Sequence, residues 1–304
     1  MSFNLDYSIN QKIELLKEYN VELYIKREDK IHPSISGNKY RKLKYNLQEA
    51  QKFGHDTLLT FGGAYSNHIA AVASAGKEFG FKTIGIIRGE ELEDKIVENP
   101  TLQFAKSKGM KFKFISRNAY RGKESEVFLN NLKKEFEDFY LVPEGGTNQL
   151  AVKGCEEILN EADTTFDYIC CAVGTGGTIS GIINASKAHQ EILGFPALKG
   201  DFLSTNISKF VSKDNWELIT DYHFGGYAKV NSELIDFINQ FKKEHNIPLD
   251  PVYTGKLMFG VIKMIEENYF KQKTKILVIH TGGLQGISGM NKRLKEKKLP
   301  LIYD

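Results

Sequence analysis

Apolar positions along the chain fall into two alternating patterns. Short apolar runs bounded by glycine or polar residues are typical of buried strands, and most of them precede apolar stripes at helical spacing. The runs that predict strands are Val21–Lys26, Thr57–Phe61, Thr83–Ile87, Lys111–Ile115, Tyr140–Val142, Tyr168–Val173 and Lys275–His280. The stripes that predict helices are Tyr40–Gln48, Asn67–Phe79, Thr101–Lys108, Glu124–Phe136, Gln149–Asn160, Ile179–Lys187, Ser232–Glu244, Lys256–Tyr269 and Gly286–Glu296. This alternation predicts an α/β fold in which helices cover mostly parallel sheets.

The predicted elements suggest two domains. Four of the predicted strands lie within residues 43–148, a stretch of typical size for a small domain. Residues 1–42 and 149–304 are then expected to form a larger domain. Residues 190–226 show no clear period, so no element is predicted there.

Composition narrows the class of protein. The chain has 304 residues, of which 41% are hydrophobic and 26% charged, as in ordinary globular proteins. The net charge of +3 is spread without a block of one sign, so no nucleic-acid partner is expected. The N-terminus lacks signal-peptide features and no apolar run has membrane-spanning length, so a cytoplasmic protein is expected. The cysteines Cys155, Cys170 and Cys171 are odd in number and two are adjacent, so no disulfide framework is predicted. Cys170 and Cys171 lie in an apolar strand pattern and are expected to fill the core rather than to bind a metal or form a redox pair.

Glycine pairs follow four of the predicted strands, at Gly62–Gly63, Gly145–Gly146, Gly176–Gly177 and Gly282–Gly283. In open parallel sheets, ligands bind beyond the carboxyl ends of the strands, where glycine lets the backbone approach a ligand closely. Any one pair also fits an ordinary helix-entry turn. Together, the four pairs predict loops that converge on one ligand.

One of these loops has the features of an anion cradle. Its residues are Gly174, Thr175, Gly176, Gly177 and Thr178, and they join a predicted strand to a predicted helix. Backbone N–H groups and a helix N-terminus at such a junction bind phosphate, although a purely structural turn has the same composition. The loop lacks the Lys-Ser/Thr ending of a nucleoside triphosphate site and the third glycine of a dinucleotide site. A single phosphate monoester is therefore the expected ligand.

A lysine with altered reactivity is predicted in Ser36–Lys42. Lys39 lies in the first turn of the predicted helix, where the helix dipole and the charges of Arg41 and Lys42 favour the neutral amine. A neutral lysine amine can form a Schiff base. By itself the segment also fits a solvated surface run. An activatable lysine together with one phosphate site is the requirement of pyridoxal phosphate.

Seven stretches extend this pattern over most of the chain. They are Lys26–Asp29, Ser36–Lys42, Gly62–His68, Val142–Gly146, Gly174–Thr178, Asp250–Lys256 and His280–Gly283. On these residues the chain resembles the fold-type II pyridoxal-phosphate enzymes of the tryptophan synthase β family. The resemblance is closest to the branch with 1-aminocyclopropane-1-carboxylate (ACC) deaminase and D-cysteine desulfhydrase. It implies two open, twisted, mostly parallel sheets flanked by helices, with the active site between domains, and a homodimer acting on a small amino acid.

The resemblance also implies roles for residues at matching positions. Lys39 would carry the cofactor as a Schiff base, and Lys42 would help to hold its phosphate. Asn67 would bond the phenolic oxygen of the cofactor, Ser66 would meet the substrate carboxylate and take part in proton transfer, and His68 would lie near the substrate. Taken alone, Ser66 and Asn67 also fit plain helix caps.

Four further residues bear on the chemistry. Tyr227 and Tyr253 match tyrosines that face cofactor and substrate, although an isolated tyrosine more often packs in a core. Thr254 and Thr281 stand where ACC deaminases carry glutamate and leucine. A threonine at position 254 would leave the pyridine nitrogen largely neutral. This difference favours α,β-elimination, with D-cysteine giving pyruvate, ammonia and hydrogen sulfide. ACC deamination to 2-oxobutyrate and a non-catalytic regulatory protein that binds pyridoxal phosphate are the alternatives.

Overall fold

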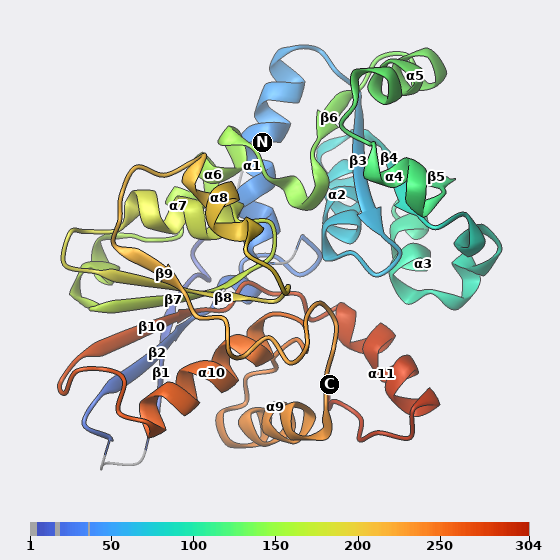
Figure 1. Ribbon diagram of the computed structural model, residues 1–304. Coiled ribbons are helices and arrows are strands. Elements are labelled where there is room, and N and C mark those ends of the chain that lie inside the picture. The colour runs from blue at the N-terminus through green and yellow to red at the C-terminus, as the bar shows by residue number, and fades with distance from the viewer. Residues whose placement is uncertain (1–4, 16–18, 36, 304) are drawn as a thin grey trace.

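The computed structural model describes residues 5–15, 19–35 and 37–303 and contains two sheets (Figure 1). The smaller sheet has four strands in the order β5-β4-β3-β6, and all three pairings are parallel. Its strands are β3 (Thr57–Gly63), β4 (Lys82–Arg88), β5 (Lys111–Ile115) and β6 (Tyr140–Val142). Because the strands are parallel, their carboxyl ends share one edge of the sheet.

The larger sheet has six strands in the order β1-β2-β10-β7-β8-β9. Its strands are β1 (Asn10–Ile13), β2 (Glu22–Lys26), β7 (Tyr168–Val173), β8 (Glu191–Pro196), β9 (Trp216–Leu218) and β10 (Lys275–Ile279). β1 pairs with β2 in antiparallel fashion, and the other pairings are parallel. The carboxyl ends of β2, β7 and β10 therefore also share an edge.

Helices cover both faces of the larger sheet (Figure 1). On one face lie α6 (Gln149–Glu156), α7 (Gly177–Ala185) and α8 (Phe202–Ser208), and on the other lie α9 (Ser232–His245), α10 (Thr254–Glu266) and α11 (Gly286–Glu296). Alternate residues of β7 enter two separate cores: Cys170 packs with α9 and α10, and Cys171 packs with α7. Burial on both faces explains why this strand is a continuous apolar run. It also raises the pKa of both thiols.

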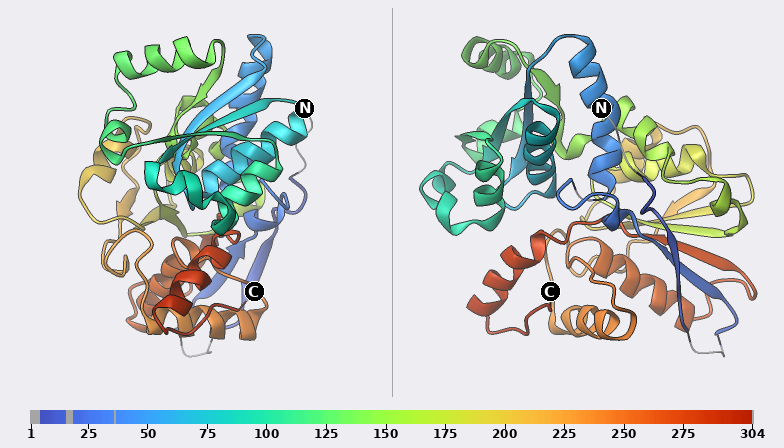
Figure 2. Two further views of the ribbon diagram at one scale, coloured as in Figure 1. Left: turned by 90° about the vertical axis from the view of Figure 1, so that its right-hand side faces the viewer. Right: turned by 180° about the vertical axis from the view of Figure 1, so that it is seen from behind.

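The smaller sheet is covered in the same way. One core lies between this sheet and the helices α1 (Asn38–Lys52), α2 (Asn67–Phe79) and α3 (Pro100–Ser107). A second core lies between the sheet and the helices α4 (Arg117–Arg121) and α5 (Glu126–Phe136). Seen from behind in Figure 2, α1 runs between the two halves of the molecule. It touches α6 so closely that a Cβ on Gly154 would lie 2.1 Å from the carbonyl oxygen of Arg41. The residues at the start of α1 are thus placed where the two sheets meet.

The structure confirms the predicted fold class and most predicted elements. Asn67–Phe79, Lys111–Ile115, Tyr140–Val142, Tyr168–Val173 and Gly286–Glu296 have the predicted bounds. The remaining predicted elements differ mainly at their ends. The 3₁₀ helices are η2 (Glu28–Lys30), η3 (Glu90–Glu98), η4 (Glu144–Gly146) and η5 (Glu161–Thr165). Among the described residues, the strands of residues 43–148 pair only with one another, and the domain boundaries remain a prediction.

No element was assigned within residues 190–226 from the sequence, and the structure has β8, α8 and β9 there. Gly194 and Pro196 interrupt the apolar pattern of β8. A Cβ on Gly194 would lie 2.6 Å from both the Ile179 and Leu218 side chains, so close packing requires glycine there. β1 was not predicted either. Within the described ranges, no helix is long and apolar enough to cross a membrane.

Candidate active site

The four glycine-pair loops converge at the carboxyl ends of β3, β6, β7 and β10. A Cβ built on Gly145 would lie 2.7 Å from the Thr175 side chain, and one on Gly146 would lie 3.0 Å from His68. A Cβ on Gly283 would lie 2.8 Å from the amide nitrogen of Asn67. These loops come from both sheets. The structure therefore brings together the residues that sequence analysis selected one loop at a time.

Lys39 is the second residue of α1 and reaches this junction. Its Nζ donates to the carbonyl oxygen of Gly145 at 3.1 Å. Gly37 precedes the helix with φ of +56°, and a Cβ there would lie only 2.0 Å from the carbonyl oxygen of Thr281. Burial of the amine and the nearby charge of Lys42 hold the pKa of Lys39 well below its usual value. The lowered pKa favours the neutral, nucleophilic form of the Lys39 amine. Ser36, the first residue of the predicted stretch, lies outside the described residues.

Lys42 lies one turn later and is fully buried. Its Nζ donates to the carbonyl oxygen of Gly145 at 3.1 Å and to the hydroxyls of Thr147 and Thr175 at 2.9 and 3.5 Å. The two hydroxyls also bond to each other at 2.6 Å. Burial lowers the pKa of Lys42. Thr147 was not predicted as a site residue, although a hydroxyl directly after a glycine pair was a readable signal.

The loop 174–178 has the geometry of an anion cradle. Gly176 caps the N-terminus of α7 with φ of +89°, and no side chain caps the first turn of that helix. A Cβ on Gly177 would lie 3.2 Å from Nζ of Lys42, so the lysine points at the loop. The Thr178 hydroxyl accepts from the amide of Asn38 at 2.7 Å, which ties the starts of α1 and α7 together. Free N–H groups, a helix dipole and a buried lysine together fit a phosphate.

His68 lies in the same junction and has one unused nitrogen. The Thr60 hydroxyl donates to the carbonyl oxygen of Val142 at 2.8 Å, so it accepts from Nε2 of His68, also at 2.8 Å. Nδ1 is thereby left as an acceptor, and among the described residues it has no hydrogen-bond partner. Burial, together with the charges of Lys39 and Lys42, holds the pKa of His68 well below its usual value. His68 is therefore a neutral acceptor that faces the site.

Ser66 and Asn67 open α2. The Ser66 hydroxyl accepts from the backbone N–H groups of His68 and Ile69 at 3.2 and 3.4 Å, so it does act as a helix cap. Asn67 turns its amide toward the loop after β10, because a Cβ on Gly286 would lie 3.5 Å from its Oδ1. The capping role does not exclude a ligand, since the hydroxyl proton of Ser66 remains free to be donated.

Tyr227 and Tyr253 come from distant segments and meet. Their rings lie edge to face with centroids 6.2 Å apart. The ring of Tyr253 covers the cradle loop, because a Cβ on Gly174 would lie 3.2 Å from it. Burial, Tyr227 and the charge of Asp250 raise the pKa of Tyr253 well above its usual value. Tyr253 is therefore a proton donor that stays protonated.

Thr254 is engaged by a carboxylate. Its hydroxyl donates to Oδ1 of Asp250 at 2.9 Å and accepts from the Asp250 backbone N–H at 2.8 Å. The Asp250 carboxylate also accepts from the N–H groups of Val252, Tyr253 and Thr254, so it caps α10. Thr281 is buried, and its carbonyl oxygen accepts from the N–H of Asn38 at 3.3 Å. The sequence indicated Asp250 only as part of the stretch Asp250–Lys256, and its capping role was not predicted.

A cation at the end of β4 was missed entirely. Arg88 pairs in register with Gly63, the glycine that begins the loop before Ser66. Its guanidinium lies 5.6 Å from the ring centroid of Tyr120, whose hydroxyl donates to Glu144 at 2.7 Å. A Cβ on Gly63 would lie 3.6 Å from this guanidinium. A single arginine at a strand end matches no sequence motif, so only the sheet register shows that it lies near the site.

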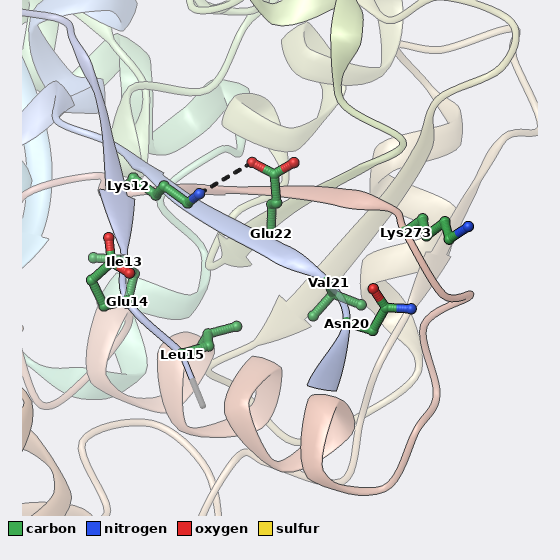
Figure 3. A pocket seen from close by; sticks show the side chains of 8 residues that line it. All are labelled: Lys12, Ile13, Glu14, Leu15, Asn20, Val21, Glu22 and Lys273. Carbon is green, nitrogen blue, oxygen red and sulfur yellow. Dashed lines mark ion pairs between the residues drawn. The ribbon is translucent and has the colours of Figure 1, made fainter. Parts of the chain in front are cut away.

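One cavity lies elsewhere in the molecule (Figure 3). It measures about 270 Å³, lies beside the β1–β2 hairpin, and contains none of the predicted site residues. Lys12 and Glu22 face each other across it at 3.4 Å, and both side chains are exposed. We assign this cavity no function.

Comparison with known proteins assigns the chain to a family. The family model described as pyridoxal-phosphate dependent enzyme matches residues 10–282, and the chain belongs to this family. It is similar to a putative 1-aminocyclopropane-1-carboxylate deaminase of Thermotoga maritima, with 32% identity over 92% of this chain and 94% of that protein. It is also similar to the mitochondrial bifunctional D-cysteine desulfhydrase/1-aminocyclopropane-1-carboxylate deaminase of Arabidopsis thaliana, with 35% identity over 88% of this chain and 73% of that protein.

A solved structure shares the fold. It is described as a crystal structure analysis of the ACC deaminase homologue, and it superposes with a TM-score of 0.80 at 26% identity, covering 95% of this chain and 93% of that one. The cofactor of this family is pyridoxal phosphate. The unused Nδ1 of His68, the uncapped start of α7 and the lysine pair on α1 fit such a group.

Proposed function

We propose that this protein is a pyridoxal-phosphate dependent lyase that performs α,β-elimination on a small amino acid, with D-cysteine as the preferred substrate. D-Cysteine and water would give pyruvate, ammonia and hydrogen sulfide. The observation that supports this choice is that both the hydroxyl and the backbone N–H of Thr254 donate hydrogen bonds to the Asp250 carboxylate. The ACC deaminases that this chain resembles carry glutamate at the position of Thr254.

The physical reason is electrostatic. Thr254 offers a hydroxyl oxygen rather than a carboxylate to a ring nitrogen at this position, so it does not keep that nitrogen protonated. The Asp250 carboxylate is occupied by three N–H groups and the Thr254 hydroxyl. Neither residue therefore supports a strong electron sink. A weaker sink suffices when a good leaving group such as hydrosulfide sits on the β-carbon.

The cofactor, when bound, supplies an electron-accepting ring that stabilises negative charge on the substrate α-carbon. Lys39 would hold its aldehyde end, and Lys42 with the 174–178 loop would hold its phosphate. Asn67 would bond its phenolic oxygen. Thr254 and Thr281 would line its edge.

Substrate groups would be held and deprotonated by the chain's own residues. Ser66 and the start of α2 would meet the substrate carboxylate. The free amine of Lys39 would accept the α-proton, because its lowered pKa favours the neutral form that can take up a proton. His68 and the tyrosines Tyr227 and Tyr253 would surround the substrate, with Tyr253 donating its hydroxyl proton in a hydrogen bond.

ACC deamination is the second candidate, because the Thermotoga and Arabidopsis relatives carry ACC deaminase in their names. The test uses the protein loaded with pyridoxal phosphate and a panel of D-cysteine, L-cysteine, D-serine, β-chloroalanine and ACC. We expect sulfide and pyruvate from D-cysteine at a higher kcat/KM than 2-oxobutyrate from ACC. A higher kcat/KM for ACC would overturn the substrate assignment. No turnover across the panel would favour a regulatory protein that binds the cofactor.

A further inference from the structure

A buried lysine on α10 holds the segment that carries Tyr227. Lys256 is 2% exposed, and its Nζ donates to the carbonyl oxygens of His223 and Gly226, both at 2.8 Å. One turn later, the ring of Phe259 meets that of Phe224 edge to face at 5.0 Å. The connection between β9 and α9 is thus fastened to one face of α10 (Figure 1).

The backbone of this connection is strained. Positive φ values occur at Phe224 (53°), Gly225 (87°), Gly226 (113°) and Ala228 (53°). Phenylalanine and alanine pay a steric cost in this region of φ, so such a conformation persists only where other contacts impose it. The two bonds from Lys256 are such contacts. They fix the carbonyl of His223 and that of Gly226, the residue directly before Tyr227, and so define the entry to Tyr227.

Stability alone is a poor explanation for this lysine. Burial lowers the pKa of Lys256 to about 8, partly offset by the charge of Asp250. Among the described residues, no carboxylate forms an ion pair with it, and both of its bonds go to neutral carbonyls. A buried cation without a counter-charge costs free energy that an apolar side chain would avoid.

We propose that Lys256 is a positioning residue that sets the place of Tyr227 against Tyr253 at the substrate side of the site. The same end of α10 carries Tyr253 directly, three residues before Lys256, and carries Tyr227 through the two carbonyl bonds. Lys256 thereby keeps Tyr227 and Tyr253 from shifting relative to each other. The catalytic part of this proposal rests on the proposed function.

The test compares Lys256→Met with Lys263→Met in the protein loaded with pyridoxal phosphate. Lys263 is on the same helix, but its side chain is 41% exposed and it pairs with Glu266 at 2.7 Å. In protein labelled with 3-fluorotyrosine, the ¹⁹F resonance of Tyr227 is assigned with Tyr227→Phe. We expect this resonance to shift or broaden in Lys256→Met and to stay unchanged in Lys263→Met. An unchanged resonance in Lys256→Met overturns the proposal, whether or not the protein turns over any substrate.

Kinetics test the catalytic part. We expect kcat/KM for the best substrate to fall about tenfold to a hundredfold in Lys256→Met, as for other displaced positioning groups. In a Tyr227→Phe background the same substitution should cost less than threefold, because Lys256 acts through Tyr227. Equal losses in both backgrounds overturn the positioning role. If Lys256→Met does not fold, Lys256→Gln, which keeps an N–H donor, takes its place in both measurements.

Discussion

Buried cations in this protein fall into two groups with opposite surroundings. Lys26, Arg27 and Arg41 each donate to a buried carboxylate, at 2.8, 2.7 and 2.8 Å respectively. Lys42 and Lys256 are equally buried, but their bonds go to carbonyl and hydroxyl oxygens. Both groups have 1–3% exposure, so burial does not distinguish them.

The two groups of cations differ in whether their charge is already neutralised by a carboxylate. The cations of the first group donate hydrogen bonds to the carboxylates of Asp163, Asp29 and Glu28. These ion pairs tie β2 and α1 to their neighbours. In the second group, burial lowers the pKa by more than nearby negative groups raise it. A buried lysine without a carboxylate has electrostatic attraction left for an incoming anion, or holds the backbone carbonyls that shape a site. Lys39, partly buried, belongs with this second group.

The largest expected effect is at Lys39. Lys39→Ala should abolish the yellow absorbance of the loaded enzyme together with turnover, because it removes the amine that is expected to form the Schiff base, while Lys42, which also donates to Gly145, is expected to hold the phosphate. Absorption spectra after reconstitution with pyridoxal phosphate measure the first, and product assays measure the second. Lys52→Ala, at the far end of the same helix, is the control and should retain both. A yellow, active Lys39→Ala protein would refute the assignment of the cofactor lysine.

Breaking a paired cation should cost stability. Glu28→Gln leaves the guanidinium of Arg41 buried without its bidentate carboxylate, so the free energy of unfolding should fall by about 3–5 kcal/mol. Urea denaturation of the protein measures it. Glu135→Gln, which removes the partner of Lys113 at the surface, should cost less than about 1 kcal/mol. Equal losses for the two variants would mean that the Arg41 pair adds no more than a surface pair.

Removing an unpaired cation should spare stability and weaken ligand binding. Lys42→Met should raise the dissociation constant of pyridoxal phosphate about tenfold to a hundredfold, as expected when a charged hydrogen bond to phosphate is lost. Titration of the cofactor-free protein, followed by absorbance or fluorescence, gives this constant. Lys44→Met is the control, because Lys44 lies on the same helix and pairs with Glu157. If Lys42→Met destabilises the fold as much as Glu28→Gln while cofactor affinity is unchanged, Lys42 belongs to the framework instead.

The smallest expected effect is a change in the pH dependence of stability. Folding lowers the pKa of Lys256 from its ordinary 10.5 to about 8, so between these values the unfolded state binds more protons than the folded state. Lys256 therefore makes stability rise with pH across this window, by about 1.4 kcal/mol per pH unit at most. The groups that face its ammonium are the Asp250 carboxylate and the carbonyls of His223 and Gly226.

Unfolding free energies from pH 8 to 10.5 should consequently rise less steeply in Lys256→Met than in the wild type. Lys263→Met should keep the wild-type slope. Parallel curves for Lys256→Met and the wild type would show that Lys256 keeps its ordinary pKa in the folded protein.

Sequence patterns predicted the local parts of this site well. Apolar period and glycine spacing are local properties of the sequence. They were sufficient to predict strand β7, the glycine loop after it and the start of α2. β8 was missed because Gly194 is needed for close contact with Ile179 and Leu218, and neither neighbour is close in sequence. Arg88 and Asp250 were missed as functional groups because their places depend on sheet register and on a helix cap.

The sequence alone determined which chemical groups are present: a lysine at a helix start, a phosphate loop and four glycine pairs at strand ends. Only the tertiary structure decided which lysines are paired. Lys26, Arg41 and Lys42 are alike in a sequence, yet their partners come from residues up to 137 positions away. Charge and pKa depend on neighbours in space and on burial, which chain order does not encode directly. Thr254 differs, because its partner Asp250 lies only four residues earlier, yet only the structure shows that the hydroxyl donates to this buried carboxylate.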